Sequence, residues 1–140
     1  MDEMVGLLKP ALYRSEGTAD APTRPALLGG VCDNGHVCFP LQHYGCERCG
    51  SVDLRSRPLA GVGRLLASAR VHLHAGKSRE APFTVGAIEL NDGPIVRTLI
   101  VGDGAPLAAG ARMATVLVPV ADAEGRACLD LRFELEASAR

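Results

Sequence analysis

Alternation of apolar and polar residues with a period of two runs through the chain from residue 58 onward and predicts β-strands. In the first strand, at 65–74, every second residue from Leu65 to Leu73 is apolar. Later strands are predicted at 83–90, 95–101, 113–120 and 127–135, with turns rich in glycine, asparagine and aspartate between them. Five strands without a clear helix favour a small closed barrel of the OB type, and a two-sheet sandwich is the alternative.

The first and last strands carry the sharpest predictions about burial. On the last strand the apolar face is expected in the core: Leu129, Leu131 and Phe133. The opposite face is expected to point outward: Cys128, Asp130 and Arg132. On the first strand Ala67, Ala69 and Val71 are expected inside, and Ser68 and Arg70 outside. Glycines at 61 and 63 indicate a bend or bulge just ahead of that strand.

The chain before the barrel divides into two further parts. Residues 1–25 carry no strong periodicity and are predicted to form an arm that lies either on its own domain or on a partner. Residues 26–57 hold most of the cysteines and are predicted to fold as a ribbon, which leaves 58–140 for the barrel. A ribbon of this size buries little apolar surface, so we expect a bound metal to supply its folding energy.

Four of the five cysteines lie between Cys32 and Cys49. Thiolates at this density are typical of tetrahedral zinc, and Cys46-x-x-Cys49 is the firmest pair. The predicted ligands of a closed, structural zinc site are Cys32, Cys38, Cys46 and Cys49. His36 in place of Cys38 is the alternative ligand set. A redox dithiol at Cys46 and Cys49, or a group of buried, unliganded thiols, is the other interpretation of the cluster.

Composition narrows the class of function. The chain has 140 residues, of which 47% are hydrophobic, enough for one core with a small appendage. The chain has fifteen basic and sixteen acidic residues, so its net charge is close to zero. It therefore has no overall positive potential that would attract nucleic acid or an anionic membrane. The N-terminus resembles neither a signal peptide nor a membrane span, so a reducing, cytoplasmic location is expected. In such a location clustered cysteines are metal ligands rather than disulfides.

Several short motifs, in their order along the chain, are similar to those of one known family. They are Leu28-Gly29-Gly30-Val31-Cys32, Gly35-His36-Val37, Phe39-Pro40, Cys46-Glu47-Arg48-Cys49-Gly50-Ser51, Leu59-Ala60-Gly61-Val62-Gly63 and Ala81-Pro82-Phe83-Thr84-Val85. Over residues 26–120 the chain resembles the zinc-ribbon and OB-fold proteins long catalogued as a domain of unknown function. It departs from the family's usual first knuckle, Cys-x-x-Cys-Gly, because Gly35 stands where the second cysteine would be.

This resemblance implies a function in acyl-CoA metabolism. Members of the family accompany thiolase-fold enzymes, and residues 29–32 and 42–46 are most similar to the small subunits of two-subunit thiolases such as benzoylsuccinyl-CoA thiolase. The chain is then expected to be a non-catalytic, zinc-binding subunit of a heteromeric thiolase or acyltransferase. Its partner, the thiolase-fold subunit, would bind the CoA thioester, while this chain supports assembly and shapes the substrate channel. No nucleic-acid or membrane partner is expected.

Two other functions are considered from the residues themselves. A zinc ribbon with an OB barrel can bind nucleic acid, but the predicted strands offer only Phe83 and Phe133 as stacking platforms. An enzyme would need a nucleophile such as Cys128 or a metal pair such as His72 and His74. Cys128 has no histidine near it in the sequence, and two solvent-facing histidines are the more ordinary interpretation of the pair.

One basic patch is a candidate binding site for coenzyme A. Lys77 and Arg79 lie in the loop that follows the first strand, and Arg64 and Arg70 lie on that strand. Such a cluster suits the phosphorylated adenosine end of coenzyme A. A solvated hairpin loop is the alternative interpretation.

Overall fold

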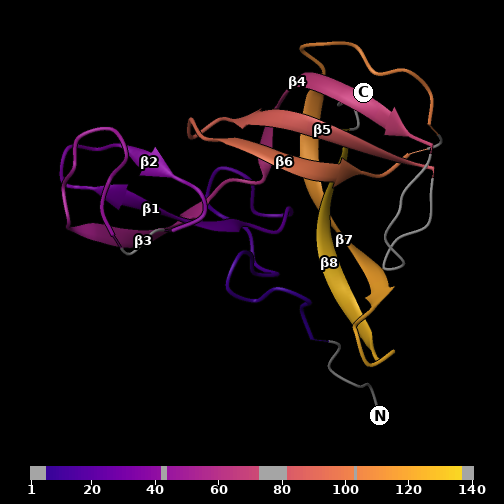
Figure 1. Cartoon of the computed structure of the whole chain (residues 1–140), viewed down its shortest axis with the longest axis horizontal. Coiled ribbons are helices and arrows are strands. Elements are labelled where there is room, and N and C mark those ends of the chain that lie inside the picture. The colour runs from indigo at the N-terminus through magenta and orange to yellow at the C-terminus, as the bar shows by residue number, and fades with distance from the viewer. Residues whose placement is uncertain (1–5, 42–43, 73–81, 103, 137–140) are drawn as a thin grey trace.

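The computed structural model describes residues 6–41, 44–72, 82–102 and 104–136. Within these ranges the chain forms eight β-strands and no helix. Figure 1 shows the strands in two groups, a small ribbon at one end and a larger barrel at the other. No helix among the described residues is long and apolar enough to cross a membrane.

The ribbon is a three-stranded antiparallel sheet in the order β2-β1-β3. Its central strand β1 (Leu27–Cys32) pairs with the short β2 (Val37–Cys38) on one side and with β3 (Leu54–Leu59) on the other. A Cβ at Gly29 would collide with the Cys38 carbonyl and the Leu59 side chain, so only glycine permits this close approach.

The barrel is closed by five strands in the order β4-β5-β6-β8-β7, with β4 and β7 completing the circle. The strands are β4 (Val62–Val71), β5 (Phe83–Leu90), β6 (Ile95–Ile100), β7 (Arg112–Ala121) and β8 (Ala127–Leu135). All the pairings are antiparallel except the contact of β6 with β8, where Ile100 pairs with Phe133. The predicted five-stranded OB barrel is therefore confirmed, and the two-sheet sandwich is not what forms.

Phe133 lies at the centre of the core with none of its surface exposed. Large apolar side chains from the other strands surround it: Leu65, Ile88, Leu90, Val96 and Met113. Leu131 is also buried, as the alternation on the last strand predicted, whereas Leu129 is only partly buried. The core thus collects residues from every strand of the barrel.

The opposite face of β8 differs from the prediction. Cys128 and Asp130 were expected to be outward-facing, but both are buried. The N-terminal arm pairs with β8, where the amide of Leu8 donates to the Leu129 carbonyl at 2.8 Å and the amide of Leu129 donates to the Gly6 carbonyl at 2.9 Å. Tyr13 of this arm donates to Asp130 at 2.8 Å, and this contact accounts for the burial of Asp130. Of the two predicted positions for the arm, its own barrel is the one observed.

The burial pattern of β4 also differs from simple alternation. The register with β5 shifts between Leu65 and Ala67, which leaves Leu66 as an extra residue. A bulge of this kind reverses the faces of the residues that follow it. Ala67 and Ala69 are exposed, although they were expected inside, and Ser68 between them is exposed as well, so both faces of β4 lie open there; Arg70 is half-buried. The irregularity that the glycines at 61 and 63 indicated occurs a few residues later, at Leu66.

The arm, the ribbon and the barrel meet at Thr115 on β7. Its buried hydroxyl donates to the Pro25 carbonyl at 2.7 Å, and its amide donates to the Gly61 carbonyl at 2.8 Å. Nearby, Arg24 Nη1 donates to the Thr115 carbonyl and pairs with Glu134 at 2.6 Å. These contacts fix the end of the arm, and with it the start of the ribbon, against the barrel wall.

Candidate metal centre

The β1–β2 hairpin places His36 opposite Cys32. Val31 pairs with Val37, so the next pair along the ladder brings Cys32 and His36 face to face. The Cys32 amide donates to the His36 carbonyl at 3.0 Å, and the Gly35 amide donates to the Cys32 carbonyl at 3.0 Å. Gly35 has a φ of 84°, a conformation that closes this tight turn at little cost for glycine. Directly opposed side chains in an antiparallel pair lie close together, so this hairpin supplies two adjacent donor groups.

The second pair of donors comes from the turn at 46–49. The Gly50 amide donates to the Cys46 carbonyl at 2.8 Å, and the Cys46 amide donates to the Ser51 carbonyl at 2.8 Å. The Arg48 amide points at Cys46 Sγ at 3.4 Å, and Gly50 takes a positive φ of 78°. This compact loop directs both of its thiols toward the β1–β2 hairpin, as Cys-x-x-Cys turns do in structural metal sites.

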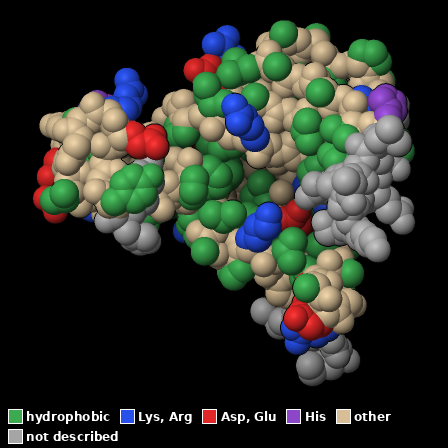
Figure 2. Space-filling view, in the orientation of Figure 1, with side chains coloured by type: hydrophobic (Ala, Val, Ile, Leu, Met, Phe, Trp, Pro, Cys, Tyr) green, Lys and Arg blue, Asp and Glu red, His purple; other side chains and the backbone are tan. Residues whose placement is uncertain are grey.

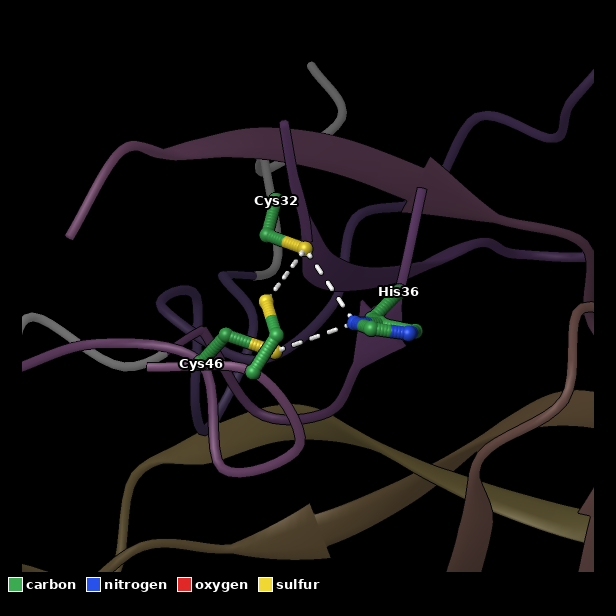
Figure 3. A group of neighbouring side chains, drawn as sticks. Cys32, His36 and Cys46 are labelled. Atoms are coloured by element: carbon green, nitrogen blue, oxygen red, sulfur yellow. Dashed lines mark hydrogen bonds between the residues drawn. The ribbon is translucent and has the colours of Figure 1, made fainter. Parts of the chain in front are cut away.

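Four donor atoms converge from these two turns. The Sγ, Nδ1 or Nε2 atoms of Cys32, His36, Cys46 and Cys49 all lie within 4.8 Å of one another. His36 Nδ1 lies 3.5 Å from Cys32 Sγ and 3.6 Å from Cys46 Sγ, and the sulfur atoms of Cys32 and Cys49 are 3.6 Å apart. Figure 3 shows Cys32, His36 and Cys46 pointing toward a common centre.

These separations fit a tetrahedral metal ion. Zn–S bonds of about 2.3 Å and Zn–N bonds of about 2.0–2.1 Å give tetrahedral edges of about 3.8 Å between sulfurs and about 3.6 Å between sulfur and nitrogen. The three measured edges agree with these values to within about 0.2 Å. The group can therefore hold a metal ion, and four protein ligands would leave no open coordination position.

The protonation of the thiols matters for metal binding because ligands must be deprotonated, and the two ends of the site differ in this respect. The side-chain amide of Asn34 donates to Cys49 Sγ at 3.2 Å. This hydrogen bond, with one from the Ser51 backbone, lowers the pKa of Cys49 to about 6. Cys32 is 1% exposed, and burial raises the pKa of its thiol. Metal-free protein thus presents one ready thiolate at the exposed edge of the site and a protonated thiol at its buried side.

Cys38, predicted as the fourth ligand, lies outside this group, and His36, the alternative, stands in its place. The hairpin register is the physical reason. Cys38 pairs with Gly30, one cross-strand pair further from the turn than Cys32 and His36. Its sulfur lies near the position a Cβ on Gly30 would occupy, beside Leu41 and away from the four converging donors.

The other candidate residues do not form a second site in the described part of the chain. Lys77 and Arg79, with His43 and His74, lie outside the described residues. Arg64 pairs with Glu89 at 2.8 Å, and Arg70 donates to Thr84 at 2.9 Å, so both strand arginines of the predicted CoA patch are engaged within the barrel. Cys128 is buried, and burial together with the charge of Asp122 raises the pKa of its thiol, which opposes a nucleophilic role.

Sequence reasoning missed two polar residues that act at a distance from their own motif. Asn34 contacts Cys49 across the site, and Asp130 accepts a buried hydrogen bond from Tyr13. Asn34 could have been noticed because it stands within the first knuckle, next to the turn at Gly35. The Tyr13–Asp130 contact gives no local signal, since it joins residues 117 positions apart.

Comparison with known proteins adds to this description. No family model matches the chain. The chain is 31% identical over 71 residues to a DUF35 domain-containing scaffold protein of Pyrococcus furiosus, and the alignment covers 50% of this chain and about half, 52%, of that relative. A chain in the solved Ltp2-ChsH2(DUF35) aldolase has the same fold, with a TM-score of 0.63 and 23% identity over 79% of this chain and 84% of that one. The chain is therefore similar to a DUF35 scaffold protein over about half of its length, and it shares the fold of a DUF35-containing structure.

Proposed function

We propose that this chain is a non-catalytic subunit that assembles with an enzyme acting on acyl-CoA thioesters. The observation that carries the proposal is its similarity to a DUF35 protein that is itself a scaffold. The structural neighbour is a chain of the Ltp2-ChsH2(DUF35) aldolase, and the name of that aldolase contains two protein names. Among the described residues one group of side chains could hold a metal ion, and its four ligands would close the coordination sphere of that metal. The chain therefore supports a partner rather than a reaction of its own.

The metal in this proposal is structural zinc, held by Cys32, His36, Cys46 and Cys49. Three thiolates and one imidazole are a common ligand set for zinc in small ribbons. The ion would link the β1–β2 hairpin to the loop at 46–49, and so replace the core that a ribbon of this size lacks. Its function would be to hold the ribbon in a shape that a partner can recognise.

The ribbon also carries exposed apolar groups suited to docking. Tyr44 is 77% exposed and Val52 is 78% exposed, and Ile95, at the start of β6, is 56% exposed. Tyr44 and Ile95 line a cleft of about 520 Å³ between the ribbon and the β5–β6 turn. Figure 2 shows hydrophobic side chains on the ribbon, on the barrel and at the junction between the two. Exposed aromatic and aliphatic groups beside a cleft are typical of protein interaction sites.

The specific candidate for the partner is a thiolase-fold subunit that binds the CoA thioester and carries the catalytic residues. The small subunit of a two-subunit thiolase, as in benzoylsuccinyl-CoA thiolase, is the finer form of the proposal, with assembly and action in the cytoplasm. In this arrangement the present chain completes the complex and shapes the channel through which the acyl group enters.

Purification of the tagged chain from its native host tests the proposal. A thiolase-fold subunit should co-elute through size exclusion, and CoA-dependent cleavage or acyl transfer should need both chains. Full turnover by the partner alone, unchanged when this chain is added, would refute the accessory role. Salt-dependent binding to single-stranded nucleic acid in place of an enzyme partner would favour the nucleic-acid module instead.

A further inference from the structure

The barrel has an opening between β6 and β8. β6 pairs with β5 along its whole length, from Ile95 to Ile100. On its other side it meets β8 only at its end, where Ile100 pairs with Phe133 and the Val101 amide donates to the Phe133 carbonyl at 2.8 Å. Figure 1 shows the two strands diverging from this point, β6 toward the ribbon and β8 toward the foot of the barrel. A parallel bridge of this kind also engages the Leu99 carbonyl, which accepts from the Phe133 amide, so the free edge of β6 on this side is the segment 95–98.

The pattern of pairing shows which backbone groups face this opening. In an antiparallel pair the amide and carbonyl of successive residues point alternately to the two sides. The Leu90 amide donates to the Pro94 carbonyl, and the Val101 amide donates to β8, so even-numbered residues of β6 bond to β5 and odd-numbered ones face the opening. The amides of Arg97 and Leu99 thus point toward β8. Among the described residues, the pairing of β6 with β8 is confined to Ile100 and Phe133, so it does not include Arg97.

A cavity of about 460 Å³ fills the opening. The edge of β6 forms one wall, β8 forms another, and the arm and ribbon close the base: the principal lining residues are Leu12, Tyr13, Leu27, Phe39, Val96 and Leu131. This volume lies within the range of about 300–1,000 Å³ that is common for ligand sites. Its lining is mainly apolar, so it suits an apolar side chain.

Two positively charged side chains line this cavity and form no ion pair among the described residues. Lys9 and Arg97 line it and are exposed, and no salt bridge to either is formed within the described ranges. The one acidic residue in the lining, Asp130, already accepts hydrogen bonds from Tyr13 at 2.8 Å and from Arg132 at 3.4 Å. An occupant with carboxylates would therefore complement the charge of the rim.

We propose that this opening binds an extended, acidic segment of the partner enzyme subunit, which adds a strand to the free edge of β6. Backbone groups of the segment would pair with the amide and carbonyl of Arg97 and with the amide of Leu99. An apolar side chain of the segment would enter the cavity, and an aspartate or glutamate would meet Lys9 and Arg97. A small apolar carboxylic acid would satisfy the charge and the cavity but would leave the edge of β6 unpaired, so the strand is the better occupant. This inference rests on the proposed function, because it needs a partner subunit.

Hydrogen exchange on the complex tests the strand pairing. The probe is the enzyme subunit that co-purifies with the tagged chain, and exchange is followed at single residues in the free and bound protein. The amides of Arg97 and Leu99 should be slowed in the complex, while those of Val96 and Thr98, already bonded to β5, should change little. A stable complex in which Arg97 and Leu99 exchange as in the free chain would overturn the inference and leave the proposed function standing.

Charge reversal gives a second, independent measurement. The double variant K9E/R97E should bind the subunit roughly tenfold or more weakly, since like charges would then face each other. Arg126→Glu, an exposed arginine in the β7–β8 turn, is the matched control and should bind as the wild type does. Unchanged affinity of the double variant for the subunit would refute the acidic segment. Binding of octanoate in the cavity, together with no effect of the enzyme subunit on the cavity, would refute it as well. Absence of any complex with the wild-type chain refutes both proposals.

Discussion

The phenol of Tyr13 donates a hydrogen bond of 2.8 Å to Oδ1 of Asp130. Tyr13 belongs to the N-terminal arm and Asp130 to the last strand of the barrel, and both are buried. The same hydroxyl accepts a bond from the Lys9 amide at 3.1 Å, so it joins the two ends of the chain through one atom. The arm also contacts β8 through the Arg24–Glu134 ion pair, through apolar side chains and through backbone hydrogen bonds of Gly6 and Leu8.

Removal of this hydroxyl should destabilise the protein. Tyr13→Phe keeps the ring but leaves a buried carboxylate without its principal donor, a change that typically costs about 1–3 kcal/mol. Equilibrium urea unfolding of the purified protein measures the loss. Tyr44→Phe is the control, because Tyr44 is 77% exposed and its hydroxyl is free to bond with water. Equal stabilities of the two variants would mean that the Tyr13 bond adds nothing to the fold.

The same contact predicts a pH dependence at alkaline pH. Burial, with the hydrogen bond and charge of Asp130, raises the pKa of Tyr13 from 10.0 to about 12. Because the pKa is higher in the folded state, the stabilisation is complete below pH 10 and is lost as the pH rises toward 12. The difference in unfolding free energy between wild type and Tyr13→Phe should therefore shrink over that interval. In the Tyr44→Phe variant Tyr13 is the only tyrosine left, so its phenolate absorbance can be titrated directly, and a midpoint near 10 would contradict the prediction.

Local patterns in the sequence were sufficient for the strands and for one of the two turns that form the candidate metal centre. Alternation located the strand of Phe133 because each inward side chain there reaches the core, and Cys46-x-x-Cys49 needs only its own turn to bring two thiols together. The choice between His36 and Cys38 depended instead on the register of a hairpin. A turn at Gly35 pairs Cys32 with His36, and composition alone does not show which residues face each other across a turn.

The remaining differences come from contacts between distant segments. Asp130 and Cys128 have the alternation of an outward face but are buried, and Asp130 accepts its buried hydrogen bond from Tyr13 of the distant arm. Leu66 looks like an ordinary member of its strand, and the bulge there shows only in the pairing with β5. Periodicity reports a strand's own two faces, whereas burial also depends on what tertiary structure places over each face.

The ligand set predicts how single substitutions affect metal content. Elemental analysis of the purified wild type should find one zinc ion per chain. His36→Ala and Cys46→Ser should each lose most of it, because each removes one of four converging donors. Cys38→Ser is the matched control and should retain full zinc, since Cys38 pairs with Gly30 outside the group. Loss of zinc from Cys38→Ser with retention in His36→Ala would restore the ligand set first predicted from the sequence.

The final prediction concerns the reactivity of Cys49 in metal-free protein. Its pKa of about 6, lowered first by the Asn34 amide and then by the Ser51 backbone, keeps it as an exposed thiolate at neutral pH. After removal of the metal with a chelator, iodoacetamide should alkylate Cys49 before the other thiols, with a rate that rises through a midpoint near pH 6. Asn34→Ala should move this midpoint upward, because it removes the donor that stabilises the thiolate. Zinc should protect the residue in the wild-type protein. Alkylation of buried Cys128 ahead of Cys49, or a midpoint that Asn34→Ala leaves unchanged, would show that the Asn34 contact does not control this thiol.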